Sequence, residues 1–336
     1  MENPNMQQIH TQIQVATAGE ALIDLIAAED GRFEPCLGGA VYNLSRALAR
    51  QGVATMYLNP LSKDRLGRQL AAALVQDGVV LAQPKPVQEV TSLAVVNLDA
   101  SGHPSYAFYR EGVADRATNA VTLTQACSQA ESLALVCTGA LALSPDDAET
   151  YLPWLAAQRQ AGRTVVIDAN LRPSVMPNLE LYRRHVLAAL QFADVIKASD
   201  EDLNCLALPG DNPLAQARHL LQACRASVIA LTLGSQGAAL LTRHGQLFTA
   251  RESEPISVVD TVGAGDCFLA GWVVTLLQHH LPTDWGSGAV SPEVARDLLC
   301  SAIASASLCV MQRGCVPPTR SEVLDRLETV ALDFAG

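Results

Sequence analysis

The sequence is poor in basic and aromatic residues and contains no long apolar run. Its 336 residues include 23 Lys and Arg against 34 Asp and Glu, a net charge of −11, and only 4% are aromatic. This acidic balance, without any basic block, disfavours a general nucleic-acid or anionic-membrane surface, although a local cationic pocket could still hold a phosphate. Residues 1–14 lack the charged and apolar regions of a secretion signal, and no run of about 18 apolar residues occurs. We therefore expect a cytoplasmic protein without nucleic-acid or membrane partners.

Metal-binding spacings are also missing from the sequence. The nine cysteines are odd in number, scattered and never spaced as Cys-x-x-Cys, so we interpret them as reduced residues of the core. The seven histidines are scattered too, and the adjacent His279 and His280 lie at the polar end of an expected helix. We therefore predict no transition-metal site.

What the sequence does contain is typical of a globular α/β protein. It is 49% hydrophobic and long enough for one large domain with a smaller appendage. Short apolar runs bounded by turn residues alternate with helical patterns, at a spacing of about 30–35 residues. Strands are expected at Ile13–Ala18, Leu133–Cys137, Thr164–Ile167, Asp194–Ile196 and Val228–Leu233, and helices at Tyr151–Gln160, Leu181–Leu190 and Ala215–Cys224. This alternation predicts a mainly parallel sheet covered by helices on both faces.

Active sites in such sheets lie at the carboxyl ends of the strands. Just past the expected strand ends the sequence places Gly139, Asp168–Asn170, Lys197–Asp202 and Gly234. We expect a loose tail over residues 1–12, followed by one domain over residues 13–330.

The first third of the chain has a different pattern. Ser92–Leu98 and Tyr106–Tyr109 alternate in polarity around the turn residues Ala100–His103, which predicts a hairpin. Together with the segment around Leu22–Phe33, this hairpin could form a small sheet apart from the main one. A small sheet beside an active site suggests a lid.

The segment DTVGAGDCFLAG at residues 260–271 combines a glycine-rich turn, an acid and the start of an apolar helix. The free N–H groups of the first helical turn, with its positive dipole end, form a binding site for an anion such as phosphate. An acid at this place would be repelled by phosphate unless it has a function, and removing a proton from an attacking hydroxyl is such a function. We predict Asp266 as a general base. The alternative is that Asp266 only caps the helix.

Two segments, GGAVYN at residues 38–43 and DTVGAGD at residues 260–266, together resemble the signatures of the ribokinase-like (PfkB) carbohydrate kinase family. Further segments match in order, and the resemblance runs from about residue 14 to residue 325: GEALID at 19–24, FYREGVAD at 108–115, IDANLRP at 167–173, LTLGSQG at 231–237 and RGCVPP at 313–318. Within the family the chain looks most like bacterial fructokinases. The resemblance implies an α/β three-layer sandwich with a mainly parallel central sheet and a small β-sheet lid, formed from parts of about residues 20–40 and 88–115.

The resemblance implies a role for each matching residue on the sugar side. Asp24, placed at the end of the first strand, would accept hydrogen bonds from sugar hydroxyls, and Arg110 and Arg172 would donate to the sugar or to a carboxylate. The expected sugar-binding residues are Asp24, Gly38, Gly39, Asn43, Phe108, Arg110, Arg172 and Asp266. Without the resemblance, Asp24 is a turn acid, the glycines open a helix, and either arginine forms a surface ion pair.

ATP and two cations complete the implied site. The anion hole would be formed by Gly263, Ala264 and Gly265 beside the catalytic Asp266. The expected ATP-binding residues are Lys197, Ser199, Thr232, Gly234, Gly237, Gly263 and Gly265. Asp202 would act on Mg²⁺ through water, and Asp260 would hold a monovalent cation such as K⁺. The chain departs from the family at Ser199 and Asp202, where Asn and Glu are usual, and at Val41-Tyr42, where Pro-Ala is usual and where Tyr42 could reshape the sugar pocket.

The sequence leaves the substrate open. Fructose is the first candidate, and 2-keto-3-deoxygluconate is the second, because Arg110 and Arg172 could clamp its carboxylate. Nucleosides come third, and a non-catalytic sugar sensor on the same fold is a further alternative. A Rossmann-type oxidoreductase is disfavoured because no G-x-G-x-x-G follows the first strand. Exposed lid edges also lead us to expect a homodimer.

Overall fold

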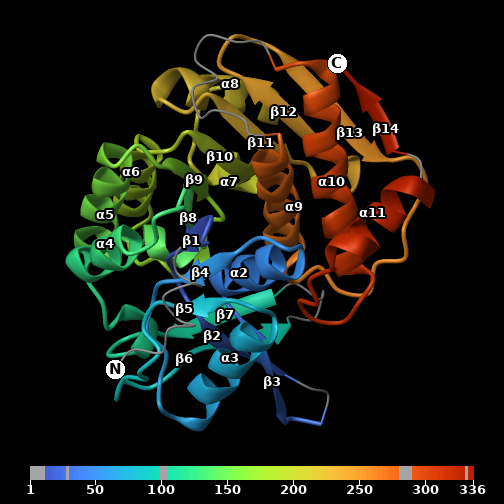
Figure 1. Ribbon diagram of the computed structural model, residues 1–336. Coiled ribbons are helices and arrows are strands. Elements are labelled where there is room, and N and C mark those ends of the chain that lie inside the picture. Colours follow the sequence, from blue (N-terminus) through green and yellow to red (C-terminus); the bar gives the residue numbers. More distant parts are fainter. Residues whose placement is uncertain (1–11, 28–29, 99–103, 280–289, 330–331) are drawn as a thin grey trace.

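The computed structural model describes residues 12–27, 30–98, 104–279, 290–329 and 332–336 (Figure 1). The expected loose tail, apart from residue 12, and the expected turn at Ala100–His103 lie outside the described residues, as does His280. The strands are β1 Val15–Thr17, β2 Leu22–Ala27, β3 Phe33–Gly38, β4 Thr55–Tyr57, β5 Val80–Leu81, β6 Ser92–Leu98, β7 Pro104–Tyr109, β8 Leu135–Gly139, β9 Thr164–Asp168, β10 Val195–Ser199, β11 Val228–Thr232, β12 Ala238–Thr242, β13 Leu247–Glu252 and β14 Leu332–Ala335. The α-helices are α2 Ala40–Arg50, α3 Arg65–Gln76, α4 Ala120–Ser128, α5 Ala148–Gln160, α6 Leu179–Leu190, α7 Asp200–Cys205, α8 Pro213–Ala223, α9 Ala264–Gln278, α10 Pro292–Val310 and α11 Arg320–Thr329.

Ten strands form one large sheet in the order β14-β13-β12-β11-β10-β9-β8-β1-β4-β5. From β11 through β5 every neighbouring pair is parallel, whereas β12, β13 and β14 add to that edge in antiparallel fashion. The parallel strands are buried on both faces, which is why they read as continuous apolar runs in the sequence. The predicted strands and the mainly parallel sheet are confirmed.

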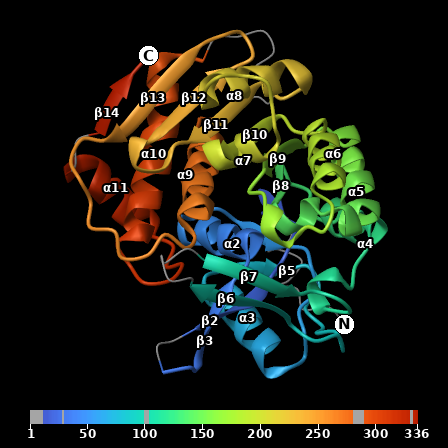
Figure 2. The ribbon, with the colours of Figure 1, turned by 180° about the vertical axis from the view of Figure 1, so that it is seen from behind.

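Helices cover both faces of this sheet, in three layers. Because side chains alternate along a strand, Val165 and Ile167 of β9 pack with α4, α5, α6 and α8, whereas Val166 packs with α2, α9 and α10 on the other face. Figure 2 shows α4, α5 and α6 on one side of the molecule and α9 and α10 on the other. The predicted three-layer sandwich is confirmed. No helix within the described ranges is long and apolar enough to cross a bilayer.

The start of α8 shows how local sequence sets the helix bounds. The Asn212 side chain accepts a hydrogen bond from the Ala215 N–H, and Pro213 occupies the first helical position, where its missing N–H costs nothing. The helix therefore begins two residues before the Ala215 start that the apolar periodicity predicts.

The small sheet has the order β3-β2-β6-β7 and lies below α2 in Figure 1, apart from the large sheet. Its strands come from the two parts of the chain where a lid is expected. Apolar contacts of Leu22 and Ala94 with Leu141 join it to the large domain, and Phe108 packs against them. Phe108 therefore lies at the junction of the lid and the large domain.

Two expectations about strand ends are wrong. Asp24 does not lie at the end of the first strand, because β1 ends at Thr17 and Asp24 is the third residue of lid strand β2, opposite Cys36 and Ala94. Gly139 and Asp168 end their strands, and Lys197 lies inside β10 rather than past it. The sequence pattern predicts the end of β10 too early because it treats the charged Lys197 as a loop residue. In the structure Lys197 still pairs with Asp168 of β9.

Candidate active site

The glycine-rich turn forms the N-terminus of α9, as the sequence predicts. Gly263 is the N-cap residue in the left-handed region, with φ of 78°, and no side chain caps the helix. A Cβ on Gly263 would lie 2.2 Å from Cys315 Sγ, so only glycine fits there. The N–H groups of Gly265 and Asp266 belong to the first turn, where a helix offers no internal acceptor. The turn is therefore suited to bind an anion.

Asp266 does not cap this helix. Its Oδ2 accepts a hydrogen bond of 2.9 Å from Asn43 Nδ2 of α2, and its side chain is buried. Burial raises the pKa of Asp266 to about 7, against the Asn43 hydrogen bond, which lowers it. A carboxyl with this pKa exchanges a proton near neutral pH. The capping alternative is wrong because no side chain caps α9 and Asp266 accepts from Asn43 instead.

Asn43 also presents an unused acceptor beside Asp266. Its Oδ1 is buried and has no hydrogen-bond partner. A buried polar atom without a partner is costly, and a hydroxyl group of a bound ligand would satisfy it. The amide and the carboxylate together can therefore position one hydroxyl and take its proton.

A buried lysine lies on the other side of the turn. A Cβ on Gly265 would lie 2.9 Å from Lys197 Nζ, and Lys197 Nζ lies 3.0 Å from Asp168 Oδ1. Burial lowers the pKa of Lys197, but the charges of Asp168 and Asp202 outweigh burial, so its pKa is raised and the ammonium stays charged. This positive charge adds to that of the helix N-terminus.

Asp24 and Arg172 lie close to this centre from the lid and from the β9 loop. A Cβ on Gly38 would lie 2.1 Å from Asp24 Oδ2, so the carboxylate packs directly on that glycine. Burial raises the pKa of Asp24 to about 6, against the charge of Arg172, which lowers it. Arg172 also lowers the pKa of Asp266. The structure thus brings Asp24, Arg172 and Asp266 into one electrostatic cluster.

Gly39 opens α2, as expected, and has φ of 106°. Next to it, Tyr42 is fully buried, and its hydroxyl donates to the Leu70 carbonyl of α3. The effect of Tyr42 on the sugar pocket stays a prediction. Its side chain fills the core beneath α3.

Arg110 belongs to a separate ion-pair network. Its guanidinium lies 3.1 Å from Asp115 and 3.4 Å from Asp147, and the side chain is largely buried. Nearby, burial raises the pKa of Glu20 to about 7, against the charge of Arg110, which lowers it. Arg110 is therefore engaged with the protein's own carboxylates, and its role as a sugar ligand stays a prediction.

Of the predicted nucleotide residues, Ser199 and Thr232 end β10 and β11, and Gly234 and Gly237 lie in the turn that follows β11. Ser199 caps α7 in a capping box with Asp202, and the Thr232 hydroxyl points back to the Ala198 carbonyl. A Cβ on Gly234 would meet nothing within 4 Å, which leaves open space there, whereas one on Gly237 would lie 2.2 Å from the Ala250 carbonyl. The missing side chain of Gly237 therefore allows β13 to pack closely against it, whereas Gly234 faces open space.

The two residues expected to act on cations already accept backbone hydrogen bonds. Asp202 accepts from Leu171 and Ser199, at 2.7 and 2.8 Å, and Asp260 accepts from Val262 and Gly314, at 3.1 and 2.8 Å. These bonds tie the β9 loop to α7 and the anion-hole turn to the loop at Gly314. Each carboxylate oxygen keeps a second lone pair for an ion or its water.

Two buried acids were not predicted as site residues. Asp168 was noted as following a strand and as part of the matching segment at 167–173, but without a role; its partner Lys197 identifies it as part of the site. Glu20 has a buried Oε2 without a hydrogen-bond partner, and its Oε1 accepts from the Ala40 N–H. The sequence feature that could have identified Glu20 is its position directly after Gly19, in the turn that follows the short strand β1.

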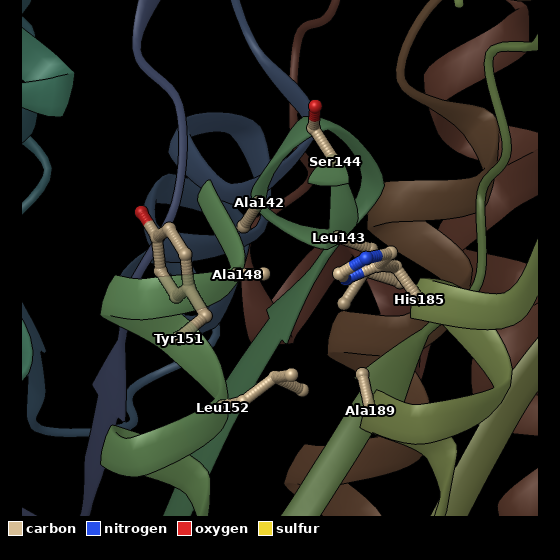
Figure 3. Close-up of a pocket in the computed structure, with 8 residues that line it drawn as sticks. All are labelled: Ala142, Leu143, Ser144, Ala148, Tyr151, Leu152, His185 and Ala189. Atoms are coloured by element: carbon tan, nitrogen blue, oxygen red, sulfur yellow. The ribbon is translucent and has the colours of Figure 1, made fainter. Parts of the chain in front are cut away.

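Figure 3 shows a small cavity away from this centre, between α5, α6 and the short helix Ala140–Leu143. It is lined by Ala142, Leu143, Ser144, Ala148, Tyr151, Leu152, His185 and Ala189. Its free volume of about 10 Å³ fits roughly one water molecule and no sugar.

Comparisons with known proteins identify the family of the chain. Over residues 12–322 the chain matches the family described as pfkB family carbohydrate kinase. A fructokinase from Rhizobium leguminosarum bv. trifolii is 30% identical over 273 residues, which cover 80% of this chain and 81% of that protein.

Solved structures share the fold over nearly the whole length. A fructokinase from Xylella fastidiosa with bound ATP has a TM-score of 0.79 at 27% identity and covers 95% of this chain and 99% of its own. A fructokinase double mutant from Vibrio cholerae, with fructose, ADP and a potassium ion bound, has a TM-score of 0.76 at 22% identity and covers 94% and 98%.

Proposed function

The chain belongs to the PfkB family of carbohydrate kinases, and from this premise we propose that it transfers the γ-phosphoryl group of ATP to a hydroxyl of fructose. One observation carries the chemistry: the buried Asp266 carboxyl, with a pKa of about 7, pairs with Asn43 at the open N-terminus of α9. A base titrating near the working pH, beside an anion site, is what hydroxyl phosphorylation requires.

In this mechanism the Asn43 Oδ1 and the Asp24 carboxylate hold sugar hydroxyls. The ionised Asp266 takes the proton of the attacking hydroxyl. The N–H groups of the anion hole, with Lys197 beside Gly265, stabilise the negative charge of the transferring phosphoryl group. Because these donors are fixed before the substrates bind, they need not reorganise during the reaction.

ATP is proposed to bind at the carboxyl ends of β10 and β11, over Gly234, with its phosphates directed at the α9 N-terminus. Magnesium fits the acids beside Lys197. Burial raises the pKa of Asp168, the charge of Lys197 lowers it, and the charge of the neighbouring Asp202 raises it; Asp168 and Asp202 would hold the hydrated ion. Mg²⁺ would there neutralise phosphate charge. Asp260 stays the proposed residue for K⁺.

Fructose is favoured over a sugar acid by the state of Arg110. A carboxylate clamp needs both Arg110 and Arg172, but the Arg110 guanidinium is already paired with Asp115 and Asp147. Arg172 remains for hydroxyls. The expected homodimer is also kept as a proposal, with β3 and β7 as the edge strands of the small sheet.

The direct test is ADP production from Mg·ATP with fructose, 2-keto-3-deoxygluconate, ribose and a nucleoside, each at several concentrations. We expect the highest kcat/KM for fructose and little ATP hydrolysis without a sugar. A clear preference for the sugar acid or for the nucleoside would contradict the proposed substrate. Absence of turnover with every acceptor would favour the sensor alternative.

Replacing Arg172 with alanine is expected to raise the KM for the sugar about 10-fold and to change the KM for ATP less than about twofold. The physical reason is the loss of a charge-assisted hydrogen bond, of about 1.5–3 kcal/mol, on the sugar side only. Initial rates with each substrate varied in turn give both constants. Equal effects on the two would contradict sugar contact.

Arg110→Ala is the matched comparison. It leaves the buried carboxylates of Asp115 and Asp147 without this cation, so its main expected effect is a lower melting temperature. The contrast between the two arginines separates sugar binding from support of the lid.

Replacing Asn43 with alanine is expected to move the acidic limb of the kcat/KM pH profile upward by about 0.5–1 pH unit. The base must be deprotonated, so activity falls as the pH falls through the pKa of Asp266, about 7. The Asn43 hydrogen bond lowers that pKa, and its loss leaves Asp266 protonated at higher pH. Rates at saturating ATP between pH 5.5 and 9, a range of roughly two units about that pKa, provide the measurement. If the apparent pKa of the acidic limb is unchanged or lower in the variant, the Asn43 hydrogen bond does not lower the pKa of Asp266.

A further inference from the structure

Three cysteines from distant parts of the chain converge behind the anion hole. Cys267 lies at the start of α9, Cys309 near the end of α10, and Cys315 in the loop that follows, and their Sγ atoms all lie within 4.8 Å of one another. Cys267 and Cys309 are fully buried. Among the residues that the structure describes, these three are the group of His, Cys, Asp or Glu side chains placed closely enough to share a metal ion.

The cluster touches the anion-hole turn directly. A Cβ on Gly263 would lie only 2.2 Å from Cys315 Sγ, so the sulfur packs directly on this glycine. Cys309 donates a 3.5 Å hydrogen bond to the Val262 carbonyl. Cys267 follows Asp266 in the sequence. An occupant of the three sulfurs would therefore contact the backbone that forms the anion site.

The chemistry of the cluster favours a soft cation. Zn²⁺ binds thiolates at about 2.3 Å, so two sulfurs on one tetrahedral ion stand roughly 3.8 Å apart, and the cluster needs to contract by about 1 Å at most. Thiolates select soft metals over Mg²⁺. The carboxylates of Asp260 and Asp266 near the cluster favour a cation over a neutral occupant.

We propose that Cys267, Cys309 and Cys315 form a thiolate site for one soft divalent cation of the zinc group. On binding, three S–H bonds are replaced by three S–metal bonds, and three protons go to solvent. No redox step is involved. Cys309 then loses the proton that it donates to Val262, so metal binding acts on the residue that precedes Gly263.

A consequence for activity rests on the proposed kinase function. Because the metal would pull Cys315 and Cys309 toward Cys267, it would shift Gly263 and weaken the anion hole. We expect stoichiometric Zn²⁺, with Mg·ATP in excess, to lower kcat at least about 10-fold, since misplacement of about 1 Å can cost up to about 100-fold. A chelator should restore the rate.

The test of binding uses the full-length, reduced, metal-free protein. Zn²⁺ is titrated in competition with a chromophoric chelator, and Cd²⁺ is added separately to record the ultraviolet charge-transfer band of cadmium–thiolate bonds. We expect one equivalent of tightly bound Zn²⁺ and a Cd²⁺ band that saturates at one equivalent. In Cys315→Ser and Cys309→Ser the affinity should fall at least about 10-fold.

Cys300→Ser is the matched control, because Cys300 lies on the same helix as Cys309, is partly buried and is outside the cluster. It should bind both metals like the wild type. Equal binding by Cys315→Ser and wild type, or a wild-type protein without a cadmium–thiolate band, would overturn the proposal. The second result needs no variant, so it holds even if a substitution prevents folding. Sugar-dependent ATP turnover of the metal-free protein is measured separately and tests the proposed function.

Discussion

Replacing Asp266 with asparagine is expected to lower kcat by about 10²–10⁴-fold while the fold and ATP binding are kept. An amide cannot take the proton of the sugar hydroxyl, whereas it fills the same space and can still accept the hydrogen bond from Asn43. The pH dependence near 7 should disappear with the carboxyl whose pKa lies there. Steady-state kinetics with fructose and a separate measurement of ATP binding by calorimetry check the two parts.

The matched control is Asp297→Asn, a conservative change at an exposed carboxylate of α10 that pairs with His279. It should leave kcat within about twofold of the wild-type value, as expected for a surface pair of small energy. Near-normal turnover in Asp266→Asn would show that another group accepts the proton. Loss of ATP binding in that variant would instead show that Asp266 supports the nucleotide site.

The second large effect is expected from Lys197→Met, which should lower the free energy of unfolding by about 3–5 kcal/mol at pH 8. Lys197 is 4% exposed and pairs with Asp168 at 3.0 Å, so the variant leaves a buried carboxylate without its cation. Urea unfolding followed by circular dichroism measures the loss. The KM for ATP should rise as well, because the charge beside Gly265 is removed.

The pH dependence of this loss follows from the pKa of Asp168. Burial already raises that pKa to about 6 although Lys197 lowers it, and without Lys197 it must rise further. Protonation removes the uncompensated charge, so the difference between variant and wild type should shrink as the pH falls from 8 to about 5.5. Adding Asp168→Asn should recover part of the loss at pH 8. An equal deficit at both pH values would contradict the charge argument.

The layered fold could be predicted because strands buried on both faces of a sheet appear in the sequence as short apolar runs. The run Val228–Leu231 is apolar at every position, as is typical of a short strand in a parallel sheet covered on both faces. Asp266 was also predictable from its neighbours, since its chemistry depends on a local turn and a helix start. The hydrogen bond from Asn43 joins residues 223 positions apart, and only the family resemblance brought the two together.

Three features could not be read from local pattern. Asp24 was placed on the wrong strand because its apolar neighbours do not tell a lid strand from a strand of the main sheet. The partners of Arg110 are Asp115 and Asp147, and only the fold decides whether a guanidinium meets its own carboxylates or a ligand. The cysteine cluster has no sequence spacing, because three separate backbone segments supply one sulfur each.

The contact between α2 and α9 has a consequence for biosynthesis. Asn43 leaves the ribosome 223 residues before Asp266, and domains begin to fold while the chain is still being made. Until α9 emerges and packs against α2, the nascent protein holds Asn43 but neither base nor anion hole. A chain released before residue 263 would therefore lack both the proposed base and the anion hole, and translation must pass Asp266 before the proposed site can form.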